Sequence, residues 1–209
     1  MDSDGSLQWL RYGSLPFDGE RLILAAQDLG LVTNAFKKMA GMSACDRCRF
    51  CHTELESVGH LVSACQTLLA DGLYTERHNK VCRYLHHLIC IYYSIEVTPN
   101  IWEHEPQPIE GNNRATIYYD KIIPTASYIQ NSAIKPDIVI WDKANQSALI
   151  IDVSVPNDSG LSRAEREKVT KYQQLKYDIM RNWRLKECEV IPVIVGATGL
   201  MKTNLKSYL

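Results

Sequence analysis

A tight group of cysteine and histidine residues is the feature that most limits how this chain can fold. Two residues separate Cys48 from Cys51, eight separate Cys51 from His60, and four separate His60 from Cys65. The first pair fits a tight turn with both thiolates on one side, and the second pair can lie about one helical turn apart. Together they supply the ligands of a tetrahedral, closed and therefore structural zinc site. Such an ion would supply folding energy to a segment too short to fold alone.

The identity of one zinc ligand has two candidates. Cys45 forms a second Cys-x-x-Cys with Cys48, so it could replace a ligand, although we favour Cys48, Cys51, His60 and Cys65. The alternative is a set of buried free thiols. The chain holds seven cysteines. An odd, unevenly spaced set is typical of a metal site in a reducing compartment, not of a secreted disulfide framework.

The composition is that of a globular protein. The chain has 209 residues, of which 45% are hydrophobic and 22% are charged, enough for one domain or for one domain with a small module. No stretch approaches the roughly 18 apolar residues that span a bilayer, so we expect no membrane partner. Lysine and arginine number 23 against 24 acidic residues, which excludes a uniformly basic coat but not a local basic face.

We expect three regions along the chain: a helical linker segment over 1–44, a CCHC zinc knuckle over 45–70, and one larger domain over 71–209. In the linker, the apolar spacing predicts a helix up to Gly30 and a second short helix over 33–40.

The larger domain alternates helices and strands. Helical spacing predicts helices over 74–93 and 162–183, and Ser162 with Glu165 has the pattern of a capping box at the start of the second one. The turn-rich stretch 99–113 is predicted as a loop or a sheet edge.

Short, β-branched apolar runs predict the strands of this domain. They cover 116–123, 137–141, 149–155 and 190–195, with a hairpin turn at 145–147. Pro192 indicates that the last strand lies at an edge or carries a bulge. The order of elements favours a mixed α/β or α+β sheet.

Two aspartates are candidates for a second metal site. Asp137 begins one predicted strand, and Asp152 lies inside the apolar run of the next. A carboxylate in a buried strand is costly unless it is paired or bound to metal. Adjacent strands can bring two carboxylates to one hard cation, and oxygen ligands favour Mg²⁺ or Mn²⁺. Such an ion can activate water and stabilise the charge of an attacked phosphodiester.

A cation near that phosphate would complete the site. The lysine position of the common (Asp/Glu)-x-Lys pattern holds Ser154, but Lys168 lies inside the apolar stripe of the following helix and Lys171 lies at its edge. Lys176 also falls near the stripe, so we favour Lys168 first and Lys171 second. The alternative is that Asp137 caps a turn, Asp152 pairs with a core Lys or Arg, and Lys168 covers apolar surface.

Basic residues gather in two stretches. Residues 161–186 carry eight basic and three acidic side chains, and residues 77–87 form a second basic stretch. Basic helices beside an acidic metal centre suit a polyanion held by its backbone. A merely solvated helix face is the alternative.

Several motifs resemble, in order, those of one family. The stretches are Ala26-Gln27-Asp28; Asp46 to Cys51 with Gly59-His60-Leu61 and Cys65; Arg77-His78-Asn79-Lys80-Val81; Lys135-Pro136-Asp137, with fourteen residues before Asp152; and Lys168 to Tyr172. They resemble the C-terminal region, a zinc knuckle and a restriction-like endonuclease, of site-specific non-LTR retrotransposon polyproteins.

The resemblance implies a PD-(D/E)XK nuclease core that nicks target DNA, so that the exposed 3′ end primes reverse transcription. Asp137 and Asp152 would bind the divalent metal, Lys168 or Lys171 would act at the phosphate or orient water, and His78 with Tyr172 would support the site. The knuckle and the basic helices would contact nucleic acid. The basic residues concerned are Arg77, Lys80, Arg163 and Arg166.

The family also implies target DNA as partner, with the element's RNA as a second candidate, a reverse transcriptase domain in the full-length parent protein, and a nuclear location. Nothing here resembles polymerase motifs, so we expect an isolated piece to nick weakly. The alternatives are a non-catalytic nucleic-acid-binding remnant, or a decayed fragment without function.

Overall fold

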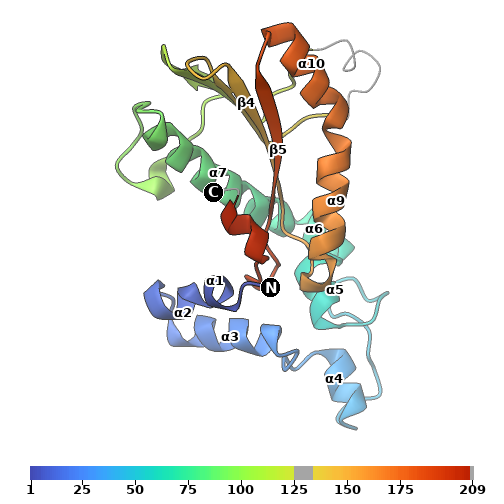
Figure 1. Cartoon of the computed structure of the whole chain (residues 1–209). Coiled ribbons are helices and arrows are strands. Elements are labelled where there is room, and N and C mark those ends of the chain that lie inside the picture. Colours follow the sequence, from blue (N-terminus) through green and yellow to red (C-terminus); the bar gives the residue numbers. More distant parts are fainter. Residues whose placement is uncertain (125–133, 208–209) are drawn as a thin grey trace.

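The computed structural model describes residues 1–124 and 134–207, and its centre is a five-stranded mixed sheet (Figure 1). The strands lie side by side in their order along the chain. The first four pair antiparallel, and the fifth pairs parallel with the fourth. They are β1 (Ile109–Gly111), β2 (Ala115–Tyr119), β3 (Ile138–Asp142), β4 (Ser147–Ser154) and β5 (Glu187–Ile194).

Helices cover both faces of this sheet. In Figure 1, α7 (Leu73–Tyr92) lies on one side of β4 and β5, and α10 (Gln173–Trp183) lies on the other. Cys82 and Cys90 of α7 belong to one apolar core, whereas Leu175 and Ile179 of α10 belong to a second. A sheet covered on both faces needs strands that are apolar throughout, which explains the nearly continuous apolar runs in β3 and β4. The predicted mixed α/β class is confirmed.

The predicted helix over 162–183 is two helices. α9 (Leu161–Lys171) ends and α10 begins at Tyr172, whose backbone leaves the helical region at φ −100° and ψ 4°. The prediction of one helix was wrong because the apolar stripe continues through the break. The capping box is also absent, since Gly160 is the N-cap and makes no side-chain bond. Glu165 instead pairs with Lys202 and accepts a hydrogen bond from the side chain of Asn204.

Most strand predictions are confirmed, with small shifts at the ends. β2 stops at Tyr119, short of the predicted end at 123, and the stretch predicted as a loop or edge contains the three-residue β1. β3 and β4 form the predicted hairpin. Pro192 lies in β5, the edge strand of the sheet, in register with Asp152 of β4. An edge position tolerates a residue without an N–H donor.

The N-terminal helices pack beside the segment that follows β5. The amide of Asp2 donates to the carbonyl of Met201 at 2.9 Å, and the Gln27 side chain donates to the carbonyl of Thr198 at 2.9 Å. The helices of this region are α1 (Ser3–Ser6), α2 (Gln8–Tyr12), α3 (Phe17–Gln27) and α4 (Asn34–Met39). α3 and α4 match the two predicted helices.

The remaining elements are short. They are α5 (Val58–Ser63), α6 (Gln66–Ala70), and the 3₁₀ turns η1 (Ile101–Glu103), η2 (Asp158–Gly160) and η3 (Thr203–Ser207). Across the described ranges, we find no helix whose length and apolar character would let it traverse a bilayer.

Candidate active site and metal centre

The four predicted knuckle ligands come together. Their ligand atoms, taken one from each of Cys48, Cys51, His60 and Cys65, all lie within 4.8 Å of one another. The Cys48 and Cys65 sulfurs are 3.9 Å apart, and the Cys51 sulfur is 3.4 Å from His60 Nε2. Cys45 is exposed and lies outside the cluster. The group is a Cys₃His cluster that could hold a zinc ion.

A turn and two short helices position these ligands. The Cys48 amide donates to the Glu54 carbonyl at 2.8 Å, and His52 adopts a left-handed φ of 60° that closes the turn. His60 lies on α5, and Cys65 is the N-cap of α6. The Thr53 hydroxyl, helped by backbone amides, lowers the pKa of Cys51 to about 5. This favours the thiolate that a metal requires.

The knuckle is held from two sides. Glu56 is fully buried and accepts hydrogen bonds from the amides of Asn34 and Arg49, both at 2.7 Å, while the Arg49 guanidinium pairs with the same carboxylate. On the other side, the Tyr74 hydroxyl of α7 donates to the Leu61 carbonyl at 2.8 Å. These contacts join the knuckle to α4 and to the helix that covers the sheet.

The two predicted acids lie at the same end of the β3–β4 hairpin. The last residue pair is Ile138 with Ile151, and one further step in this register sets Asp137 opposite Asp152. The amide of Val153 donates to Asp137 Oδ2 at 2.6 Å. Both carboxylates raise the pKa of the same two groups, the Cys82 thiol and the Tyr172 phenol, in each case after the larger effect of burial. The two acids thus act on common neighbours.

Lys168 is the lysine that faces an acid. Its Nζ pairs with Asp152 Oδ2, and the Tyr172 hydroxyl donates to Asp152 Oδ1. The side chain of Asp152 is 3% exposed and that of Lys168 is 25% exposed, so the pair is anchored in the core and opens outward at the ammonium. The Tyr172 hydroxyl also lies 2.9 Å from the Lys135 carbonyl, but its single proton can serve only one acceptor. The helix break at Tyr172 therefore brings a phenol onto the buried acid.

Lys171 lies elsewhere. Its Nζ is 4.8 Å from the centre of the Tyr172 ring, a cation–π distance, and the residue is exposed. Of the two predicted lysines, the structure brings only Lys168 to the acids.

His78 is the partner of the other acid. Its Nε2 is 3.3 Å from Asp137 Oδ2, and its Nδ1 is 3.7 Å from the sulfur of Cys82. The hydrogen bond to Asp137, with a smaller contribution from Cys82, raises the pKa of His78 to about 11. His78 is therefore protonated at neutral pH, and each acid has one basic partner.

Two hollows meet at His78. The larger, of about 370 Å³, is lined by His78, Lys168, Arg77 and the residues that end β4. The smaller, of about 300 Å³, is lined by His78, Cys82 and Asp137. Lys168 thus faces one hollow and Asp137 faces the other, with the His78 side chain between them.

The predicted nucleic-acid-binding residues are spread over two helices. Arg77 on α7 is half-buried and donates to the carbonyls of Val62 and Val155, at 2.8 and 3.3 Å. Lys80, Arg163 and Arg166 are exposed. Lys80 pairs with Glu76, and Arg163 pairs with Glu167, each one helical turn away. Arg77 therefore braces the fold beside the larger hollow, whereas the other three lie at the surface.

Cys82 is the site residue that the sequence reasoning missed. With His78 and Asp137 it forms a group whose ligand atoms lie within 4.8 Å of one another. The signal was its position four residues after His78, which places both side chains on one face of a helix.

No protein-family model matches this chain, and a comparison with curated proteins found no match.

Proposed function

We propose that this chain is a divalent-metal-dependent DNA endonuclease domain with a PD-(D/E)XK, restriction-like core. The observation that carries the proposal is the meeting of Asp137, Asp152, Lys168 and Tyr172 at one end of the β3–β4 hairpin. In line with the motif resemblance, we place it in a site-specific non-LTR retrotransposon. There it would nick target DNA, so that the new 3′ end primes reverse transcription by the parent's polymerase domain in the nucleus.

The acids fit a hard divalent cation. Asp152 Oδ2 is buried, and within the described residues its one charged partner is the Lys168 ammonium. With Asp137 it offers carboxylate oxygens, the donors that Mg²⁺ and Mn²⁺ prefer. When bound, such an ion supplies an activated water and stabilises charge on the phosphate.

The other side chains have distinct tasks in this proposal. Lys168 contacts Asp152 and also lines the larger hollow, so its ammonium can bind a phosphate oxygen there. The Tyr172 hydroxyl holds the orientation of Asp152 through its hydrogen bond. His78 and the Val153 amide do the same for Asp137.

The knuckle and the helix surfaces serve binding. Cys48, Cys51, His60 and Cys65 would hold a structural zinc ion, which ties the short turn and α5 into one unit. Three exposed basic residues on α7 and α9 can contact the backbone of DNA, and the element's RNA is a second ligand of the same chemistry. These residues are Lys80, Arg163 and Arg166.

Nicking of supercoiled plasmid with Mg²⁺ tests the catalytic assignment. We expect Asp152→Asn to lower the nicking rate by about 100-fold or more, because it removes a charge that the metal requires. The matched control is Asp142→Asn, another buried aspartate on the same sheet, whose partners are Tyr93 and Asn145. Equal cleavage by wild type and Asp152→Asn would exclude Asp152 from catalysis.

A second function is favoured by one observation: His78 and Lys168 already neutralise both acids. A non-catalytic nucleic-acid-binding remnant could keep such pairs without turnover. DNA binding by the wild type, with no nicking under Mg²⁺ or Mn²⁺, would select this function over the first.

A further inference from the structure

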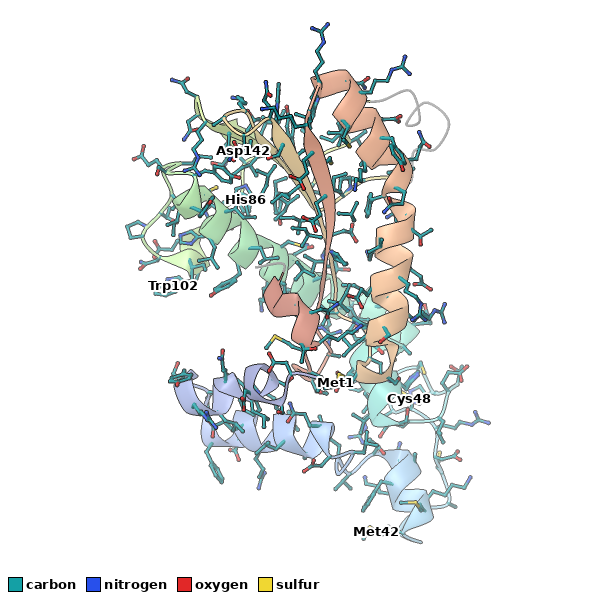
Figure 2. All side chains as sticks on the ribbon, in the orientation of Figure 1. Met1, Met42, Cys48, His86, Trp102 and Asp142 are labelled. Atoms are coloured by element: carbon teal, nitrogen blue, oxygen red, sulfur yellow. The ribbon has the colours of Figure 1, made fainter. Side chains whose placement is uncertain are left out.

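We propose that the chain carries a second zinc site, formed by His86 and Cys90 of α7 and Glu110 of β1, with His104 orienting the His86 ring. This cluster lies away from the knuckle: Figure 2 shows His86 between α7 and the sheet, and Cys48 near α5. It is also separate from the residues proposed for nuclease activity.

The spacing of the donor atoms fits an ion. One ligand atom from each of His86, Cys90 and Glu110 lies within 4.8 Å of the other two. His86 Nε2 is 3.2 Å from Glu110 Oε1 and 4.0 Å from the Cys90 sulfur. Zinc bonds of about 2.0 to 2.3 Å in a tetrahedron set ligand atoms about 3.3 to 3.8 Å apart. The knuckle has a similar spacing, with atom pairs at 3.4 and 3.9 Å.

His104 supplies the outer contact that metal-binding histidines need. Its Nε2 is 2.8 Å from His86 Nδ1, and the two rings stack with centroids 5.1 Å apart. A proton on His86 Nδ1 can be donated to His104, which leaves the lone pair of His86 Nε2 for the ion. In this tautomer the free nitrogen of His86 faces Glu110, at 3.2 Å from Oε1.

The cluster is largely buried. His86 and Cys90 are fully buried, while the Glu110 side chain is 18% exposed and offers a path to solvent.

A helical repeat relates this cluster to the acidic site. His78, Cys82, His86 and Cys90 recur at every fourth position of α7, so they form one stripe that turns slowly around the helix. Each His–Cys pair meets one carboxylate, from Asp137 or from Glu110. At the second pair an ion would fasten the short edge strand β1 to α7.

Metal content of the full-length chain tests the proposal. The protein is reconstituted with Zn²⁺ under reducing conditions, dialysed against metal-free buffer and analysed by atomic emission. We expect His86→Gln and Glu110→Gln each to hold one zinc equivalent fewer than wild type. The matched control is His87→Gln, a neighbouring buried histidine outside the cluster, which should keep the wild-type content.

Cobalt gives an independent readout. Co²⁺ bound by Cys90 adds sulfur-to-metal charge-transfer absorption, which Cys90→Ser should remove while the knuckle bands remain. Circular dichroism shows which variants fold. If His86→Gln does not fold, the test relies on Glu110→Gln, whose side chain is more exposed. The proposal would be wrong if folded Glu110→Gln kept the wild-type zinc content and Cys90→Ser left the cobalt spectrum unchanged. The cluster would then be a set of hydrogen-bonded side chains that binds no metal.

Discussion

At the scale of single residues, the buried ion pair of Lys168 and Asp152 is the most important contact for both stability and the proposed activity. Asp152 is almost fully buried; the Lys168 ammonium compensates its charge, and the Tyr172 hydroxyl donates a hydrogen bond to it. A buried charge that loses its partner costs far more than a surface pair contributes. The pair therefore serves stability in the free protein, and under the proposed function it serves catalysis as well.

Lys168→Met should lower both stability and activity. We expect a loss of about 2 to 3 kcal/mol in the free energy of unfolding, because Asp152 would keep its burial without its counter-ion and the lysine is only partly exposed. Nicking should fall by about 100-fold. Urea denaturation and plasmid nicking measure the two effects.

Lys171→Met is the matched control for that prediction. Its ammonium is exposed and lies over the Tyr172 ring, so we expect a change below about 1 kcal/mol and little change in nicking. A larger loss in Lys171→Met than in Lys168→Met would reverse the assignment of the two lysines.

The contribution of Glu56 to stability should depend on pH. Its hydrogen bond with Arg49 is the main cause that lowers the pKa of Glu56 from 4.5 to about 2. A carboxyl whose pKa is depressed by folding stabilises the protein above its unfolded pKa, and this contribution is lost as pH falls toward the folded pKa. Wild type should therefore exceed Glu56→Gln in stability above pH 4.5, and the gap should close toward pH 2.

Thermal unfolding of both proteins with excess zinc measures this gap. The zinc ligands are the same in both, so their protonation cancels in the difference. A gap that stays constant from pH 6 to pH 3 would contradict the role given to Glu56.

At the scale of elements, the pattern of apolar residues predicts the strands and fails at the helix break. β3 and β4 are short β-branched runs, and their hairpin register sets Asp137 opposite Asp152. The break between α9 and α10 cannot be seen in the spacing of apolar residues, because the same apolar stripe continues through both helices. Ser162 and Glu165 form no capping box because Lys202 and Asn204, distant in sequence, take the Glu165 carboxylate.

The candidate site was predictable to a similar degree. Spacing alone identified the knuckle ligands, and a charge inside an apolar strand identified Asp152. Helical periodicity could not choose between Lys168 and Lys171, because both lie near the stripe and the break at Tyr172 decides which one faces the acid. Cys82 escaped notice because a buried cysteine in an apolar helix face is an ordinary core residue.

The residue at the junction of α9 and α10, Tyr172, donates its hydroxyl proton to Asp152. Tyr172→Phe keeps the ring in the core but leaves Asp152 Oδ1 without its donor. We expect a loss of about 1 to 3 kcal/mol in the free energy of unfolding, measured with urea. Tyr177→Phe on α10 is the control, since Tyr177 is 64% exposed. Equal effects of the two substitutions would show that the hydroxyl contributes nothing.

At the scale of the whole molecule, the sheet and the knuckle have separate sources of stability. The cores on the two faces of the sheet are built from α7, α10 and the strands, and they contain none of the four knuckle ligands. None of the apolar clusters found among the described residues includes a residue of the segment 45–70. We therefore expect the metal to matter locally and not for the sheet.

Removal of zinc by a chelator should unfold the knuckle and spare the sheet. Hydrogen exchange followed by mass spectrometry should show lost protection over residues 45–70 and retained protection in β3, β4 and β5. Cys45→Ser is the control, because this exposed thiol lies outside the cluster and its loss should leave the exchange pattern unchanged. Equal loss of protection in the strands would mean that the metal holds the entire fold.

The backbone contact between Asp2 and Met201, 2.9 Å long, brings the first and last described segments of the chain together. The path from Asp2 to Met201 therefore returns close to its starting residue. If a short linker joined these two residues and the turn at Asn145 were opened instead, the strands would follow one another in a rotated order while every neighbour stayed in place. We expect such a permuted chain to keep the same sheet, because the contacts between its elements would be unchanged.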